Sequence, residues 1–131
     1  MFTGIIQSKG SIEKIDFDNN LYLIKTNLDL NDCSIGSSIC CDGVCLTAIA
    51  IINKDKNFFF KVNIGEETIK RSNLIYWKEG TIINIEKSLR FGDEISGHFV
   101  YGHVDLTLNI SKIEKLKKSW EFEFSFNDND C

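Results

Sequence analysis

Proline is absent from the 131 residues of this chain, and methionine occurs once, at position 1. Turns must therefore be made by Gly, Asn, Asp and Ser, and these residues interrupt the apolar runs at short intervals. No segment approaches the roughly 20 apolar residues that span a bilayer. The opening residues, MFTGIIQSKG, also lack a basic leader followed by a long apolar run. These absences predict a cytoplasmic protein with no membrane partner.

The chain also has no excess of basic residues, since 15 Lys and Arg face 19 Asp and Glu, for a formal net charge of −4. Nucleic-acid-binding proteins usually gather a basic face. One basic cluster, Lys112, Lys115, Lys117 and Lys118, alternates with apolar residues and Glu114, and we interpret it as a solvated strand edge or turn. We therefore expect small-molecule or protein partners and no nucleic acid.

Short apolar runs predict an all-β fold with one helical turn. The expected strands cover residues 2–7, 10–16, 20–27, 37–41, 44–52, 57–64 and 81–87. Between the last two, EETIK at 66–70 starts with acidic residues and ends on Lys70 and Arg71, which suits a short helix and its dipole. Strands of this length and spacing indicate a small closed barrel or a sandwich, and a barrel leaves no strand edge exposed.

After residue 97 the pattern of the first 30 residues begins again. Gly102 follows Gly4 by 98 residues, Ile110 follows Ile12 by the same offset, and WEFEFSFN takes the place of NLYLIKTN. This indicates an internal repeat. We expect a first domain at residues 1–97 and the beginning of a second, incomplete copy at residues 98–131.

Three of the five cysteines lie in GSSICCDGVCLTAI, residues 36–49. An odd number of cysteines without a secretory signal predicts free thiols. Cys40 and Cys41 are neighbours in a strand and point to opposite faces, and zinc sites usually need a second cysteine pair, so we expect no metal site. From the residues alone, Cys45 is either a nucleophile paired with a base such as His103 or, the favoured interpretation, a small and partly buried hydrophobic residue in a strand.

Four motifs occur in the order and spacing of the α-chain type of riboflavin synthase: MFTGII, GVCLT after a Gly-x-Ser segment, EET after a strand, and GDEISGHFVYGHVD. The sequence resembles this family over residues 1 to about 110. The resemblance implies two similar six-stranded Greek-key barrels, with the first complete at residues 1–97. It also implies a homo-oligomer, a trimer for the full-length family or a dimer for a chain of this length.

The resemblance implies a reaction as well. A four-carbon unit is transferred between two molecules of 6,7-dimethyl-8-ribityllumazine, which gives riboflavin and a ribitylamino-pyrimidinedione without a cofactor. The second barrel's ligand segment, its Lys and Asp, and a trimerising helix have no counterparts in this chain. We therefore expect binding with little or no turnover. The alternatives are a non-catalytic lumazine- or flavin-binding module and, less favoured, an oligonucleotide-binding barrel.

By the same resemblance, the groups near the chemistry are Phe2, Ser38, Cys45 and His103. The implied substrate-binding residues are Gly4, Ile5, Ile6, Val44, Cys45, Leu46, Thr47, Asn63, Ile64, Gly65, Glu66, Glu67, Thr68, Gly102, His103 and Val104. Purely structural roles stay open: Phe2 as a barrel plug, Ser38 bonded to backbone, and Thr68 as a helix cap.

Overall fold

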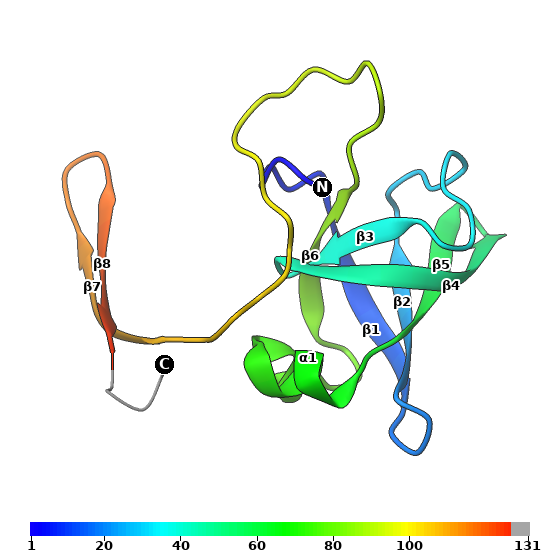
Figure 1. The fold of residues 1–131 in the computed structure, drawn as a ribbon, viewed down its shortest axis with the longest axis horizontal. Helices are drawn as coiled ribbons and strands as arrows, with labels where there is room; N and C mark the ends of the chain where they lie inside the picture. Colours follow the sequence, from blue (N-terminus) through cyan, green and yellow to red (C-terminus); the bar gives the residue numbers. More distant parts are fainter. Residues whose placement is uncertain (127–131) are drawn as a thin grey trace.

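The computed structural model describes residues 1–126, which form a barrel, two short helical segments and a separate hairpin (Figure 1). The barrel strands are β1 (Ser8–Asp16), β2 (Leu21–Thr26), β3 (Ser38–Cys41), β4 (Val44–Lys54), β5 (Asn57–Asn63) and β6 (Ile82–Lys87). The α-helix α1 (Glu66–Arg71) and the 3-10 helix η1 (Asn73–Tyr76) lie between β5 and β6, and β7 (Asn109–Lys115) and β8 (Trp120–Ser125) form the hairpin. Among residues 1–126 no helix is long and apolar enough to cross a membrane.

The six barrel strands close in the order β1-β2-β5-β4-β3-β6, with every pair antiparallel. The β2–β3 and β5–β6 connections skip neighbouring strands, as in a Greek key. The predicted closed barrel is confirmed, and so is the helical turn, which spans Glu66–Arg71. Closure pairs β1 with β6, the two strands that would otherwise be the edges of the sheet, whereas the first residues of β4 are not paired with β5.

Every second side chain along the barrel strands points inward and fills the barrel interior. Ile24 of β2 lies opposite Phe60 of β5, and both side chains are fully buried. Along β3 the side chains of Ile39 and Cys41 join the core, whereas Cys40 points to the outer face. The remaining core side chains on the strands are Ile12, Ile15, Tyr22, Val44, Leu46, Ala48, Phe58, Val62, Ile83 and Ile85.

The tip of the β3–β4 hairpin is tied to the rest of the barrel. Asp42 and Gly43 form its two-residue turn with φ values of 48° and 86°, the positive pair that suits a type I′ turn. The Asp42 carboxylate accepts a hydrogen bond from the Asn84 backbone N–H at 2.7 Å and one from the Trp77 indole N–H at 3.1 Å. These bonds fix the hairpin against β6 and η1.

One strand expectation is wrong. Residues 2–7 do not form a strand; Phe2 makes an isolated bridge to Val100, and β1 begins at Ser8. Gly4 has a φ of +81°, which interrupts an extended backbone. The N–H groups of Thr3 and Gly4 bond to the Glu86 carboxylate instead of to a neighbouring strand.

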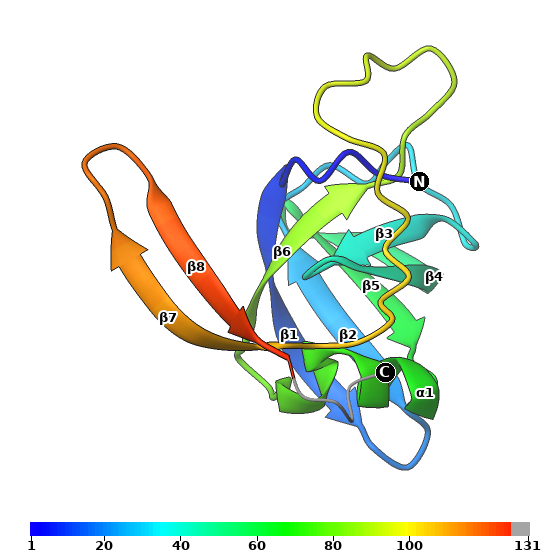
Figure 2. The ribbon, with the colours of Figure 1, turned by 60° about the vertical axis from the view of Figure 1, so that its left-hand side comes forward.

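The β7–β8 hairpin stands apart from the barrel in Figures 1 and 2. It resembles the β1–β2 hairpin in detail, because its register shifts between Ile110 and Lys112, 98 residues after the shift between Ile12 and Lys14. The side chains that correspond to the buried face of β1–β2 are half-exposed here: Ile110, Ile113, Phe122 and Phe124.

Gly10 provides a test of the barrel's packing. A Cβ at this position would lie 2.4 Å from Ile85 Cδ1 and 2.7 Å from the Lys25 carbonyl oxygen. Backbone cannot move aside cheaply, so Gly10→Ala should lower the free energy of unfolding by about 1–3 kcal/mol, measured by urea denaturation. Gly65→Ala is the control, because Gly65 has a φ of −66° and open space around it. Equal stability of the two variants would contradict this packing.

Candidate functional site

Two segments lie across the outer face of β6, β3 and β4. We call residues 1–6 the amino-terminal segment and residues 98–104 the crossing segment. Phe2 and Val100 exchange backbone hydrogen bonds of 2.7 and 3.0 Å, and the His98 N–H donates to the Thr3 carbonyl at 3.1 Å. Figure 2 shows the crossing segment running down past β3 and β4 toward α1.

Gly102 brings the crossing segment into contact with β4. The Cys45 N–H donates to the Gly102 carbonyl at 2.8 Å. A Cβ on Gly102 would lie 2.8 Å from the Cys45 nitrogen, and its φ is +73°, so both distance and backbone conformation favour glycine. Val104 then packs against the barrel core. The structure thus brings Cys45 together with predicted residues 102–104.

The junction between β5 and α1 lies at the lower end of the crossing segment. The Ile64 N–H donates to the Asn20 carbonyl at 3.0 Å, which fixes the backbone where β5 ends. Gly65 precedes α1 in an extended conformation and is exposed. The Arg71 guanidinium donates to the Asp105 carbonyl at 3.3 Å, which ties the chain just after Val104 to α1. The helix that begins within predicted residues 63–68 is therefore tied, at its last residue, to the chain that follows the crossing segment.

The predicted side chains on β3 and β4 divide between two faces. Val44 and Leu46 are buried in the core, so any ligand on the outer face meets their backbone and not their side chains. Ser38, Cys45 and Thr47 occupy outward positions, with Ser38 directly opposite Thr47. Four further predicted residues are exposed: His103, Asn63, Glu66 and Glu67. Thr68 is half-buried.

The amino-terminal segment lies on the β6 side of this face. The Gly4 N–H donates to Glu86 at 3.1 Å, and Ile5 lines a cavity of about 490 Å³ together with Glu86, Lys87 and Arg90. The side chains of Ile5 and Ile6 are 49% and 45% exposed. These contacts place predicted residues 4 and 5 beside β6, with Gly4 next to Val100 of the crossing segment. Phe2 is fully buried.

Sequence reasoning missed Glu86. Its side chain is 2% exposed, and its carboxylate accepts hydrogen bonds from the Thr3 N–H at 2.6 Å, the Thr3 hydroxyl at 2.7 Å and the Gly4 N–H at 3.1 Å. In IINIEK, period two puts Glu86 on the outer face, where an acidic residue is ordinarily solvated. No pattern within that strand signals a partner 83 residues earlier in the chain.

Cys40 lies between Cys45 and Glu86 across the sheet. Burial, and then the nearby Glu86 carboxylate, raise the pKa of the Cys40 thiol to about 11. Burial holds the pKa of Cys41 well above its ordinary value. Cys33, Cys40, Cys41 and Cys45 are free thiols, and Cys131 lies outside the described residues. Within residues 1–126 no three His, Cys, Asp or Glu side chains gather closely enough to hold a metal ion.

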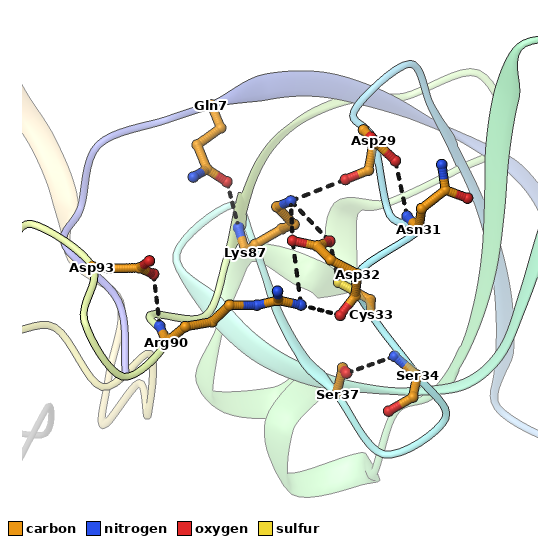
Figure 3. A network of polar contacts seen from close by, with 10 residues as sticks. All are labelled: Gln7, Asp29, Asn31, Asp32, Cys33, Ser34, Ser37, Lys87, Arg90 and Asp93. Atoms are coloured by element: carbon orange, nitrogen blue, oxygen red, sulfur yellow. Dashed lines mark hydrogen bonds and ion pairs between the residues drawn. The ribbon is translucent and has the colours of Figure 1, made fainter.

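A polar network closes the other side of the cavity near Ile5 (Figure 3). The Lys87 ammonium donates to both Asp32 carboxylate oxygens at 2.9 Å and to the Asp29 carbonyl at 3.0 Å. Arg90 donates to the Asp32 carbonyl and pairs with its carboxylate at 3.2 Å. The network ties the β2–β3 loop to the chain after β6. The hydrogen bond from Lys87, aided by both positive charges, lowers the pKa of Asp32.

Comparison with known proteins decides the family. Residues 3–88 match the lumazine binding domain family. The chain belongs to this family. Among the curated relatives, the riboflavin synthase of Brucella abortus is 42% identical over 108 residues, which cover 80% of this chain and 54% of that protein. The riboflavin synthase of Saccharomyces cerevisiae is 36% identical over 137 residues, which cover 98% of this chain and 56% of that protein.

This chain therefore spans about half the length of these curated relatives. A solved structure of LumP complexed with 6,7-dimethyl-8-(1′-D-ribityl) lumazine superimposes with a TM-score of 0.73. That match covers 98% of this chain and 71% of LumP at 17% sequence identity. It shows that the two proteins share a fold.

The Asp32 network predicts a pH-dependent contribution to stability. A carboxyl whose pKa is lowered by folding stabilises the native state above its unfolded pKa of about 3.9, and this stabilisation is lost as the pH falls through the folded pKa. Asp32→Asn should therefore lower stability at pH 7 by about 0.2–1 kcal/mol, since the pair is partly exposed. The difference from wild type should shrink below about pH 4.

Thermal melts between pH 3 and pH 7 measure this difference. The matched control is Asp18→Asn, which replaces an exposed aspartate in the β1–β2 turn. A stability difference for Asp32→Asn that stays constant, or grows, as the pH falls would contradict the assigned ion pairs.

Proposed function

We propose that this chain is a riboflavin synthase or the amino-terminal portion of one, and that its barrel binds 6,7-dimethyl-8-ribityllumazine and the product riboflavin. The family match over residues 3–88 carries the proposal. The convergence of Cys45, the β5–α1 junction and residues 102–104 on one side of the barrel supports it. These are the segments that the resemblance to riboflavin synthase assigns to substrate.

We call Cys45, the β5–α1 junction and residues 102–104 the ligand wall. This wall suits a planar heterocycle with a polyol chain. A pyrimidinedione ring presents alternating donors and acceptors at its edge, which backbone N–H and C=O groups can match. Exposed Gly65 leaves room for a close approach to backbone at the start of α1. The hydroxyls of Thr47, Thr68 and Ser38 are the proposed partners for the ring or the ribityl chain.

The proposed reaction needs two substrate molecules. One lumazine gives up four carbons and the other gains them, so the atoms balance without an external oxidant or reductant. The protein has to hold the two rings face to face, to move a proton from a ring methyl group and to support nucleophilic addition at the ring. Cys45 and His103, on β4 and on the crossing segment beside it, are the proposed groups for this chemistry, with Ser38 and Phe2 in supporting positions.

We further propose that residues 98–131 begin a second lumazine-binding repeat. Two pairs of equivalent features support this: the register shift common to β1–β2 and β7–β8, and the positive φ of both Gly4 and Gly102. The second substrate then belongs to another barrel, from a second repeat or from another copy of the chain. A homo-oligomer and a cytoplasmic location remain predictions.

The alternative is a non-catalytic lumazine- or flavin-binding module. The likeness in fold to LumP, whose structure holds the lumazine, favours this second candidate. Both candidates require ligand binding, and turnover separates them.

We expect this chain to bind the lumazine and to convert it very slowly or not at all. The ligand wall can orient one lumazine ring, but the reaction needs a second ring aligned with the first. Without it, the activation barrier is not lowered by the proximity of the two reactants, which is worth about 7–11 kcal/mol in well-oriented systems. Titration with 6,7-dimethyl-8-ribityllumazine should quench its fluorescence, while riboflavin formation in the same sample stays near background. Turnover close to that of a full-length riboflavin synthase would contradict the need for a second barrel.

The Cys45→Phe variant localises the binding. A phenyl ring at this outward position of β4 should displace the crossing segment or occupy the space of the ligand. Either effect should weaken the quenching of lumazine fluorescence. Ile52→Phe is the matched control, because Ile52 is also exposed on β4 but lies toward its other end. Equal affinity of both variants would place the ligand elsewhere, and an absence of quenching by the wild type would defeat the proposed function.

A further inference from the structure

The Glu86 carboxylate is buried on the outer face of the barrel and not in its core. Its three donors all belong to Thr3 and Gly4. A buried carboxylate is costly unless it is well hydrogen-bonded, and here backbone and hydroxyl donors supply the bonds. Glu86 therefore fixes the amino-terminal segment at a defined position above β6.

The amino-terminal segment in turn holds the crossing segment. Four backbone hydrogen bonds hold residues 98–104 in the described part of the chain, and three of them join Phe2 or Thr3 to Val100 or His98. The fourth is the bond from Cys45 to Gly102. A connection therefore runs from Glu86 through Thr3 and Phe2 to the residues beside Cys45.

We propose that Glu86 is a positioning residue for ligand binding: it anchors the amino-terminal segment, which holds residues 102–104 in place against β4. This rests on the proposed function, because the ligand is the one named there. Glu86 is on β6 and Cys45 is on β4, with Cys40 of β3 between them. Glu86 therefore acts on the site through the amino-terminal and crossing segments. Ordering the crossing segment before the ligand arrives lowers the entropic cost of binding.

The test uses Glu86→Ala and Glu86→Gln in the whole chain. The alanine variant loses all three acceptor contacts, whereas the glutamine variant keeps one carbonyl oxygen that can accept from Thr3. We expect Glu86→Ala to weaken lumazine binding by about tenfold or more and Glu86→Gln to be intermediate. Thr3→Val removes one of the three bonds to Glu86 and also the bond that the Thr3 hydroxyl accepts from the Ile5 N–H. It should weaken binding more in wild type than in the Glu86→Ala background, where only the bond from Ile5 is left to lose.

Amide hydrogen exchange separates positioning from a general loss of stability. The Val100 and Cys45 amides should lose protection in Glu86→Ala, because their acceptors lie in the connected segments, while the amides of Ile24 and Phe60 in the barrel keep theirs. The control is Glu79→Gln, since Glu79 also accepts a backbone N–H, from Ile15 at 3.2 Å, at a site away from the ligand wall.

Loss of protection at Val100 and Cys45 together with weakened binding would support the proposal. Unchanged protection, or lost protection with wild-type affinity, would overturn it, and so would a Glu79→Gln variant that weakens binding as much. If the Glu86→Ala variant loses amide protection throughout the barrel, the Glu86→Gln variant is used instead. Its amide protection at Val100 and Cys45 and its lumazine affinity then decide. A wild-type chain that binds no lumazine would defeat the proposed function, and with it the role of Glu86 in ligand binding.

Discussion

The hydrogen bond from the Cys45 N–H to the Gly102 carbonyl joins the barrel to the segment that covers its outer face. It exists because of the two-residue turn at Asp42 and Gly43. That turn sets Cys45 opposite Cys40 as a non-hydrogen-bonded pair of the antiparallel ladder. The Cys45 N–H therefore points away from β3. A close approach of backbone then requires glycine at position 102. Residues separated by more than 50 positions in the chain meet at this bond, and the proposed ligand wall is built around it.

The barrel could be predicted from local pattern because burial follows the two-residue period of each strand. Residues 20–27 and 57–64 alternate, and their inward members Ile24 and Phe60 meet in the core. Residues 2–7 are as apolar as a strand, but they pair with a glutamate side chain and with Val100. Local sequence carries no information about partners more than 80 residues away, so this expectation was wrong.

The candidate site was predictable only in part. The resemblance to riboflavin synthase named residues 44–46, 63–68 and 102–104. The structure joins Cys45 to Gly102 and ties the end of α1 to Asp105, just after the third of these segments. The same resemblance named residues 4–6, which lie on the β6 side of the crossing segment. Glu86 was not found, because its burial depends on two segments that cover the outer face and not on the pattern of β6. The catalytic and binding roles remain predictions.

The proposed ligand site lies between β4, the start of α1 and the crossing segment. Backbone amide chemical shifts, followed by nuclear magnetic resonance during a titration with riboflavin, test it most directly. We expect the largest shifts at Cys45, Gly65 and Val104. We expect small shifts around Lys87 and Arg90, which line the cavity on the β6 side. Largest shifts at those two residues, with unchanged signals at Cys45 and Val104, would contradict this position of the ligand.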